Sequence, residues 1–423
     1  MQEDFLHYIW KHHAFSTPNL STTTGEAVVI SDVGQHNFNA GPDFFNAQLS
    51  IDNQRWAGNV EIHIKSSDWY LHNHQNDPNY DNVILHVVWE HDAEIFRKDN
   101  SEIPTLELKH LIDNRLASNY KILMHSKSWI NCEKDFHAID DFHLKNWLDR
   151  LYIERLERKF ETISEMLKEA ENDWEAVLFK MLLKNFGLKV NGEAFLSISK
   201  TIDYTTVRKL QSKAFDLEAL LFGQAGLLDK DIQETYFQRL REQFQFLKLK
   251  FKLNNEGVVP VQFFRLRPSN FPSIRLSQFA NLYTREQQLF SKLMATQSKL
   301  DIYRYFNIGV SEFWKTHYTF KRVSKASNKM LSKAFIDLLV INTIIPLKFS
   351  YAFSRGKNNV SELLELVSEV SMENNSITAK FLDLRPMKKS ALNSQALLQL
   401  KQDYCDKNKC LHCAIGNRLI VKN

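Results

Sequence analysis

The segment GPDFFNAQLSIDNQRWAGNVEIHIK, residues 41–65, decides the fold of the first third of the chain. Polar and apolar residues alternate across residues 45–51 and again across residues 56–65, which is the pattern of strands with one buried face. The Asp52-Asn53 pair between them favours a tight turn. The segment therefore predicts a β-hairpin.

Further strands are expected on either side of this hairpin. Short apolar runs cover residues 27–32 and 103–108, and residues 80–89 contain the longer run VILHVV. Residues 3–10 favour an opening helix. Together these elements predict a small mixed α/β, nuclease-like sheet domain over residues 1–130.

The hydrophobic pattern changes to helical spacing from Phe142 onward. Helical spacing recurs within residues 173–188, 205–222, 229–252, 277–299, 310–325, 333–345, 359–371 and 391–404. Eleven of the fifteen histidines lie at or before position 125, which supports a boundary close to that point. We therefore predict an α+β protein with the sheet domain, a helical domain over 131–330 and a C-terminal helical region over 331–423.

Length and charge constrain the function only loosely. A chain of 423 residues with a formal net charge of +4 has room for two or three domains, and it permits a nucleic-acid partner without demanding one. Residues 334–352 are apolar but contain Asp337, Pro346 and Lys348, which favours a buried helix over a membrane span. Because no secretory pattern opens the sequence, we expect a cytoplasmic protein without a membrane partner.

Two carboxylates are candidate ligands of a metal ion. Alternate residues of a strand share a face, so Glu61, His63 and Lys65 should point the same way, and Asp43 lies at the mouth of the preceding strand. Carboxylate oxygens suit Mg²⁺ or Mn²⁺, and His63 or Lys65 could orient or deprotonate a water for phosphodiester hydrolysis. The alternative is a hairpin with polar outer residues and a buried ion pair.

These motifs resemble the PD-(D/E)XK nuclease superfamily. There a Pro-Asp pair sits before or on one strand, Asp/Glu-x-Lys sits on the next, and a Glu often lies on the first helix. The Pro-Asp pair at 42–43 and Glu61-x-His63 match this pattern, and Glu3 could be the helix carboxylate. The departure is His63, which stands where the superfamily has Lys, with Lys65 two residues later.

The run DWYLHNH, residues 68–74, looks like the very-short-patch-repair branch of that superfamily. In that branch an Asp, a strand His and later histidines beside a Trp serve the metal and the water. The resemblance adds Asp68, His72 and His74 as possible accessory residues. On a strand, His72 and His74 would share one face as a metal-binding pair.

Three later residues have a functional and a structural interpretation. Asp77 could join the site or cap the turn that its neighbouring proline favours. Tyr80 could contact a substrate or pack in the interior. His86 lies in an apolar strand, which is more typical of a hydrogen-bonded core histidine.

The cysteines predict a second metal site. Cys405, Cys410 and Cys413 crowd into nine residues, and Cys132 is the one remaining cysteine. Four thiolates suit a structural Zn²⁺ ion or a [4Fe–4S] cluster, and His412 could replace Cys132 in a zinc site. The arrangement resembles the iron–sulfur staple of certain nucleases, although there the distant cysteine precedes the catalytic motifs.

Residues 263–275 mix arginines, aromatics and prolines. Arginines can hold phosphates and aromatic rings can stack on unpaired bases, so Arg265, Arg267 and Arg275 are candidate contacts to nucleic acid. The alternative is an internal plug, with the aromatic rings packed inward and the arginines paired to neighbouring carboxylates.

Longer motifs make the whole chain similar to an uncharacterised bacterial family, a domain of unknown function. These motifs are GPDF (41–44), GNVEIH (58–63), SDW (67–69), HNHQNDPNYDNVILHVV (72–88), NFG (185–187), ALLFGQAGLL (219–228) and RLRPSNFPSIRL (265–276). This resemblance implies no activity.

The site motifs favour a metal-dependent nuclease or phosphodiesterase that acts on DNA or RNA. The alternatives are a non-catalytic nucleic-acid-binding or scaffold protein on a degenerate nuclease-like fold, and a small-molecule hydrolase with a His-based site. The sequence has neither a P-loop Gly-x4-Gly-Lys motif nor a Gly-x-Ser-x-Gly elbow, which argues against NTP-driven motors and serine hydrolases.

Overall fold

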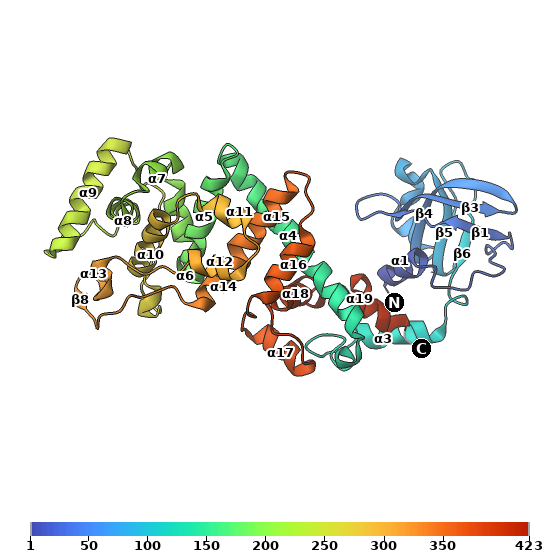
Figure 1. The fold of residues 1–423 in the computed structure, drawn as a ribbon. Coiled ribbons are helices and arrows are strands. Elements are labelled where there is room, and N and C mark those ends of the chain that lie inside the picture. The colour runs from blue at the N-terminus through green and yellow to red at the C-terminus, as the bar shows by residue number, and fades with distance from the viewer. Residues whose placement is uncertain (1, 422–423) are drawn as a thin grey trace. The chain divides into compact units, whose positions relative to one another are not determined.

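The computed structural model describes residues 2–421, which form two compact units (Figure 1). Unit 1 comprises Met1–Trp147 together with Leu400–Asn423, and unit 2 comprises Leu148–Gln399. Unit 1 carries a mixed sheet, whereas unit 2 is mostly helical. The predicted combination of a small α/β part and a large helical part is therefore confirmed.

The two units differ from the three predicted domains. The first boundary falls after Trp147, and within the described residues none falls near 330, because α14 (Lys333–Leu339) packs against α5 (Trp174–Phe186). The last stretch of the chain belongs to unit 1, because Leu411 and Ile420 are buried in the core of that unit.

The main sheet of unit 1 has, within residues 2–421, the strand order β1-β3-β4-β5-β6, with β2 paired to β3. Its strands are β1 (Val28–Asp32), β2 (Gln35–His36), β3 (Phe44–Ile51), β4 (Gln54–Lys65), β5 (Val83–Glu90) and β6 (Thr105–Glu107). The β1–β3 and β3–β4 pairs are antiparallel, whereas the β4–β5 and β5–β6 pairs are parallel.

The predicted hairpin is the β3–β4 pair. Its turn residues Asp52 and Asn53 have φ angles of 45° and 68°, a left-handed conformation that Asn and Asp tolerate better than most residues. The Asp52 carboxylate also accepts a hydrogen bond of 2.9 Å from the backbone N–H of Ala27. The turn therefore closes the hairpin and ties it to the start of β1.

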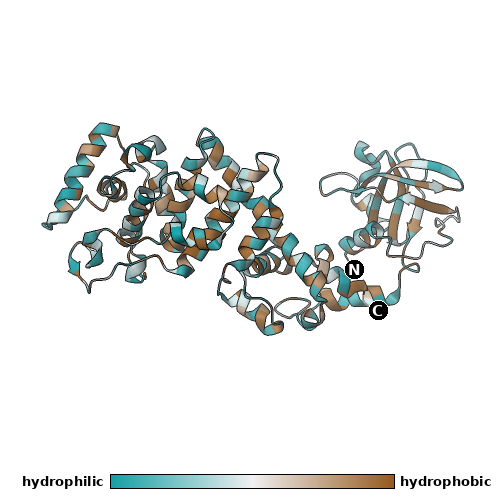
Figure 2. Cartoon of the chain, in the orientation of Figure 1, coloured by the Kyte–Doolittle hydropathy of each residue, from teal (hydrophilic) through white to brown (hydrophobic). Residues whose placement is uncertain are grey.

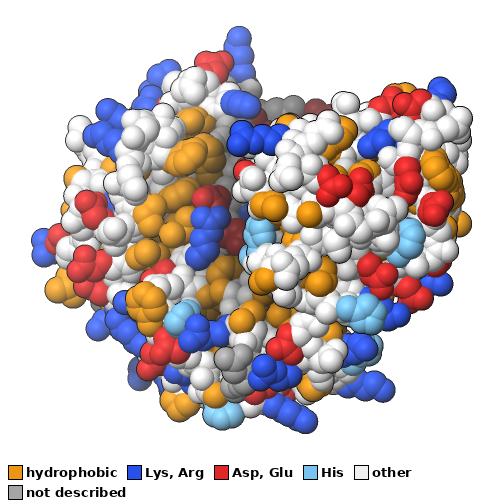
Figure 3. Space-filling model, turned by 90° about the vertical axis from the view of Figure 1, so that its right-hand side faces the viewer, with side chains coloured by type: hydrophobic (Ala, Val, Ile, Leu, Met, Phe, Trp, Pro, Cys, Tyr) orange, Lys and Arg blue, Asp and Glu red, His pale blue; other side chains and the backbone are white. Residues whose placement is uncertain are grey.

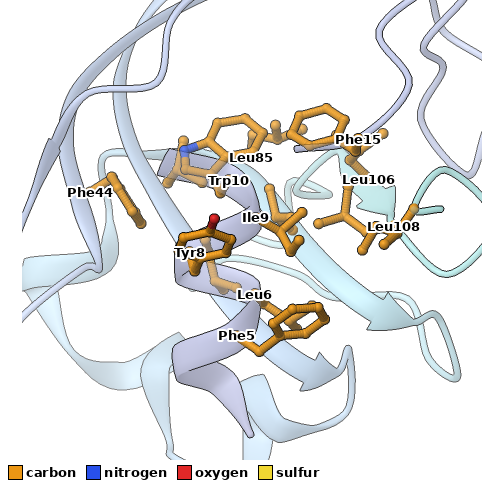
Figure 4. Packing of buried hydrophobic residues seen from close by; sticks show 14 of the residues in the cluster. Phe5, Leu6, Tyr8, Ile9, Trp10, Phe15, Phe44, Leu85, Leu106 and Leu108 are labelled. Carbon is orange, nitrogen blue, oxygen red and sulfur yellow. The ribbon is translucent and has the colours of Figure 1, made fainter. Parts of the chain in front are cut away.

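Helix α1 (Glu3–Lys11) packs its apolar side against the sheet (Figure 4). Phe5, Leu6, Ile9 and Trp10 recur at helical spacing, and all four are fully buried. Trp10 also donates a hydrogen bond of 3.1 Å from Nε1 to the carbonyl of Val33. Burial of each large apolar side chain contributes roughly 1.5–3 kcal/mol, so this contact fixes α1 on the strands.

The connection from β4 to β5 packs as a second, smaller core. It contains α2 (Asp68–Leu71) and the 3₁₀ turns η1 (His74–Asn76) and η2 (Pro78–Tyr80). Its Trp69 packs with Val83, Ile95 and Ile103. Because both sides of the parallel strand are covered, β5 is buried over its first six residues.

The remaining elements of unit 1 come from both ends of its sequence. They are α3 (Asn114–Met124), η3 (Phe136–Ala138), the start of α4 (Asp141–Glu169), η6 (Leu400–Cys405), η7 (Cys410–His412) and α19 (Ala414–Val421). Helix α19 packs against α3, where the Asn119 side chain donates a hydrogen bond of 3.1 Å to the carbonyl of Ile420. The chain end is thus built into the unit.

Unit 2 contains the rest of α4 and a series of shorter elements. They are α5, α6 (Leu188–Lys200), α7 (Tyr204–Leu210), α8 (Ala214–Gln224), α9 (Thr235–Phe251), η4 (Pro268–Asn270), α10 (Pro272–Arg285), α11 (Leu289–Ala295), α12 (Lys299–Tyr305), α13 (Glu312–Lys315), β7 (His317–Thr319), β8 (Arg322–Val323), α14, η5 (Val340–Ile344), α15 (Ile345–Phe353), α16 (Val360–Glu369), α17 (Ser376–Leu384) and α18 (Ala391–Gln399). The prediction of one helix over residues 310–325 is wrong, because a short helix and a two-stranded hairpin occupy that range.

One helical stretch, Lys333–Phe353, is long and apolar enough to cross a membrane, and 78% of its most apolar window is buried inside the protein. Its polar side chains have partners within unit 2. Lys348 Nζ donates to the carbonyls of Leu293 and Thr296 at 2.9 and 2.7 Å, and Tyr303 donates to the Asp337 carboxylate. Figure 2 shows the apolar residues of this stretch in brown. These contacts are those of a core helix.

Candidate metal centre

Asp43 and Glu61 are brought together by the register of the β3–β4 hairpin. Phe44 pairs with Val60, so Asp43 at the entrance of β3 lies beside Glu61 on β4. The backbone N–H of Asp43 donates to Glu61 Oε2 at 3.1 Å, and the N–H of Ile62 donates to Asp43 Oδ2 at 2.9 Å. One oxygen of each carboxylate is therefore held by the neighbouring strand.

The surroundings of Glu61 disfavour its negative charge. Burial raises the pKa of Glu61 to about 9, and the nearby charge of Asp43 acts in the same direction. Burial and the Asp43 charge also raise the pKa of Glu3 on α1, which places this third carboxyl within electrostatic reach. A cation at this position would relieve the repulsion among the three groups.

Helix α1 adds a histidine that the sequence analysis missed. His7 Nε2 lies 3.2 Å from Asp43 Oδ2. Burial alone would lower the pKa of His7, but the adjacent Asp43 carboxylate outweighs it and raises that pKa. The signal that could have found His7 is its position one helical turn after Glu3, since residues four apart share a helix face.

Three histidines converge next to Glu61. His63 projects from β4 and is buried, His72 directly follows α2 and is exposed, and His74 begins η1. Between the last two, Asn73 has a left-handed φ of 61°, which turns the chain back toward β4. One ring nitrogen from each histidine lies within 4.8 Å of the other two. The predicted pair His72-x-His74 is therefore brought to His63 by a turn and not by a strand.

Three separations among these histidines and Glu61 are close to the edge length of a tetrahedron around one metal ion. His63 Nε2 lies 3.1 Å from His72 Nδ1, and Glu61 Oε1 lies 3.5 Å from His63 Nε2 and 3.3 Å from His74 Nε2. Ligands bound about 2.0–2.1 Å from a tetrahedral ion are separated by about 3.3 Å. His74 Nε2 is buried and makes no hydrogen bond, so it lies beside Glu61 Oε1 without being directed at it. Two atoms that bind the same metal ion are also adjacent without a hydrogen bond between them.

Neighbouring side chains hold the histidine rings in place. His63 Nδ1 lies 2.8 Å from Nε2 of His86, which is fully buried on β5. Tyr80 stacks on His74 with ring centroids 3.8 Å apart, and Trp69 contacts His74 edge-on. Burial lowers the pKa of His63 to about 3 and that of His86 well below its usual range. Both rings are thus neutral, the form of imidazole that binds metals.

Other predicted residues serve the backbone or the surface. Lys65 is exposed at the end of β4, and its Nζ lies 3.8 Å from an Asp92 oxygen. Its ion pair is therefore with Asp92 and not with Glu61. Asp68 accepts a hydrogen bond of 2.9 Å from the N–H of Lys65, and Asp77 accepts one of 3.0 Å from that of Asn79. Asp77 therefore caps η2, as its structural interpretation predicted.

The arginines predicted to contact nucleic acid lie in unit 2, in different environments. Arg265 and Arg267 are exposed. Arg275 is 6% exposed, its guanidinium lies 3.6 Å from the ring centre of Phe335, and it donates to Asn270 Oδ1 at 2.6 Å. This burial contradicts a surface role for Arg275, but its partner is an amide and not the carboxylate that the internal-plug alternative predicted, and Phe264 is exposed. On the face drawn in Figure 3, basic and acidic side chains are mixed.

The four cysteines are gathered in unit 1. Cys132, Cys405, Cys410 and Cys413 are free thiols that line one cavity. His412 instead lines a different cavity together with His7 and His36, although it lies between two of the cysteines in sequence. Burial and the neighbouring thiols raise the pKa of Cys132, and burial raises that of Cys413 to about 11.

Comparison with known proteins gives one match. The family described as "Protein of unknown function (DUF2851)" matches residues 3–376. The chain belongs to this family. The DUF2851 match includes the whole histidine and carboxylate cluster and most of unit 2, and it ends before Cys405. No curated protein and no solved structure matches the chain. Membership of an uncharacterised family is thus confirmed, and the nuclease resemblance stays a prediction.

Proposed function

We propose that the protein is a metal-dependent phosphodiesterase that cleaves nucleic acid. The observation that carries the proposal is the convergence of His63, His72 and His74, which each offer a ring nitrogen within 4.8 Å of the other two, with Glu61 Oε1 lying 3.5 Å from His63 Nε2 and 3.3 Å from His74 Nε2. Three imidazoles and one carboxylate favour Zn²⁺ or Mn²⁺. This proposed donor set adds three imidazoles to the oxygen-rich site for Mg²⁺ or Mn²⁺ expected from Asp43 and Glu61.

The class of substrate follows from where the motifs lie on the elements. Asp43 opens β3, Glu61 and His63 lie on β4, and Glu3 lies on α1, which are the positions that the PD-(D/E)XK resemblance implies. A polar cavity of about 220 Å³ adjoins the site at His7 and is also lined by Lys11. Lys11 and Asp4 both line this cavity, so one cation beside the metal centre is available to meet an anionic phosphodiester.

Each part of the site has a role in this reaction. The bound ion would supply an acidified water and stabilise charge on the attacked phosphate. Asp43 lies beside Glu61 with one oxygen near His7, so this pair can accept and pass on the proton of the attacking water. The exposed His72 marks the side from which substrate would enter, since Glu61 and His63 are buried.

One observation favours the alternative of a non-catalytic nucleic-acid-binding or scaffold protein. An oxygen of Asp43 and an oxygen of Glu61 already accept backbone N–H groups, so the pair has a structural role whether or not a reaction occurs. Under this alternative the protein would bind nucleic acid in a salt-dependent manner without turnover.

The test is cleavage of labelled single- and double-stranded DNA and RNA by chelator-stripped protein resupplied with Mn²⁺, Zn²⁺ or Mg²⁺. We expect Glu61→Gln to lower cleavage by more than about 100-fold, because losing a direct ligand should exceed the 10- to 100-fold effect of an outer partner. The matched control is His137→Gln, which changes an exposed histidine of the same unit. Equal cleavage by wild type and Glu61→Gln would remove the proposal.

A further inference from the structure

Four cysteines from distant parts of the sequence surround one cavity in unit 1. Cys132 lies in the connection between α3 and α4, Cys405 ends η6, Cys410 begins η7 and Cys413 precedes α19. Cys132 and Cys405 are separated by 273 positions. Folding therefore completes a ring of four thiols that neither segment holds alone.

We propose that Cys132, Cys405, Cys410 and Cys413 bind a [4Fe–4S] cluster that fastens the end of the chain to unit 1. Four thiolates are the ligand set of such clusters and also of structural Zn²⁺ sites. This site is independent of the histidine centre on β4, so either proposal can fail without the other.

The distances between the four sulfur atoms favour a cluster over a single Zn²⁺ ion. Tetrahedral Zn²⁺ binds sulfur at about 2.3 Å, which places the four sulfur atoms about 3.8 Å apart. Among the described residues, His63, His72 and His74 form a group with ligand atoms all within 4.8 Å of one another, and the cysteines form no such group. Among the four cysteines, all of which the structure describes, no three sulfur atoms all lie within 4.8 Å of one another, so the thiols are spaced more widely than the ligands of one Zn²⁺ ion. This spacing favours a cuboidal cluster, in which each thiolate binds its own iron atom.

Hydrogen-bond donors are directed at the sulfur atoms. The Asn131 side chain donates to Cys410 Sγ at 3.4 Å. The backbone N–H groups of Ile415 and Gly416, at the start of α19, act to lower the pKa of the Cys413 thiol and so favour its thiolate form. Donors to the ligating sulfurs stabilise the negative charge of a thiolate-bound cluster and tune its potential. The cavity therefore offers the second layer of contacts that such a site needs.

Gly416 shows how closely the last helix approaches the cysteine turn. A Cβ atom added to Gly416 would lie 2.1 Å from the carbonyl oxygen of Cys410. A larger residue would push α19 away and carry Cys413 with it. The close approach keeps both thiols on the same cavity.

The cluster would make the position of the chain end depend on iron. Other described contacts of this end include the burial of Leu411 and Ile420, the hydrogen bond from Asn119 and a contact of 3.0 Å between the Arg418 guanidinium and His143 Nε2. A cluster adds a cross-link between segments far apart in sequence, and metal binding of this kind contributes directly to folding.

The experiment is anaerobic purification of the full chain, followed by reconstitution with Fe²⁺ and sulfide and by assay of absorbance near 400 nm, iron and acid-labile sulfide. We expect about four iron and four sulfide per chain. Cys410→Ser should lose most of the absorbance and expose α19 to hydrogen–deuterium exchange. His412→Gln, in the same turn, should retain the wild-type spectrum.

Circular dichroism shows whether each variant is folded. If Cys410→Ser has unfolded, Cys405→Ser takes its place in the same assays. Zinc without iron and sulfide, or no metal after reconstitution, would overturn the proposal. So would full retention of iron by folded Cys410→Ser and Cys405→Ser.

Discussion

At the scale of single residues, the candidate metal centre depends on side chains that β4, the turn after α2 and helix α1 bring together. The alternation along β4 predicts that Glu61 and His63 share a face, and the hairpin predicts that Asp43 approaches them. The return of His74 depends on the left-handed conformation of Asn73, which has no periodic signal in the sequence. The contact of His7 with Asp43 depends on how α1 packs, which local patterns do not encode.

Lys65 provides a test at the same scale, because the superfamily resemblance and the structure disagree about it. Its ammonium is exposed and lies 3.8 Å from an Asp92 oxygen, an ion pair worth less than about 1 kcal/mol. We predict that Lys65→Ala changes the rate of nucleic-acid cleavage by less than about threefold and the free energy of unfolding by less than about 1 kcal/mol.

The comparison is made by single-turnover cleavage and urea denaturation, with Glu61→Gln assayed in parallel. If Lys65→Ala abolished cleavage while the folded state kept its stability, Lys65 would be part of the reacting site. The assignment of the water-handling role to Asp43 and His7 would then be wrong.

At the scale of elements, strands with one apolar face were easier to predict than elements that depend on long-range contacts. The strands of the β3–β4 hairpin begin within two residues of their predicted starts and end at their predicted ends. Residues 310–325 have helical spacing, yet β7 and β8 form there. Their His317–Thr319 segment is rich in β-branched and aromatic residues, and the neighbouring Trp314 is fully buried.

A buried carboxylate holds several helices of unit 2 together. Glu218 on α8 is 0% exposed and accepts hydrogen bonds from Tyr236 on α9 at 2.7 Å, from Ser277 on α10 at 2.9 Å and from Trp314 on α13. These donors favour the charged form, but the cost of burial is larger and raises the pKa of Glu218. Its proton therefore binds more tightly in the folded state.

The sign of the pH dependence follows from this shift. A carboxyl with a raised folded-state pKa makes the protein lose stability as pH rises above the unfolded value of 4.5. We predict that the stability of wild type relative to Glu218→Gln falls as pH rises from 4.5 towards neutrality. Urea denaturation of both proteins across this range measures it, and a constant or rising difference would contradict the raised pKa.

At the scale of the whole molecule, the return of the chain end to unit 1 is the feature that the sequence left open. A run of helical patterns from Phe142 to the C-terminus looks continuous, so the final region was predicted as a separate part. The burial of Leu411 and Ile420 and the meeting of Cys132 with the last three cysteines instead unite the two ends. The cysteine count predicted this union, but the hydrophobic pattern did not.

We predict that one divalent ion binds between β4 and the turn that follows α2. The most direct measurement is anomalous X-ray diffraction at the manganese edge from crystals soaked in Mn²⁺, because Mn²⁺ prefers nitrogen and oxygen ligands and avoids the thiols. We predict one strong peak within about 2.0–2.3 Å of His63 Nε2, His72 Nδ1, His74 Nε2 and Glu61 Oε1. A fully soaked crystal without a peak among these atoms, or with manganese bound elsewhere in unit 1, would contradict the account.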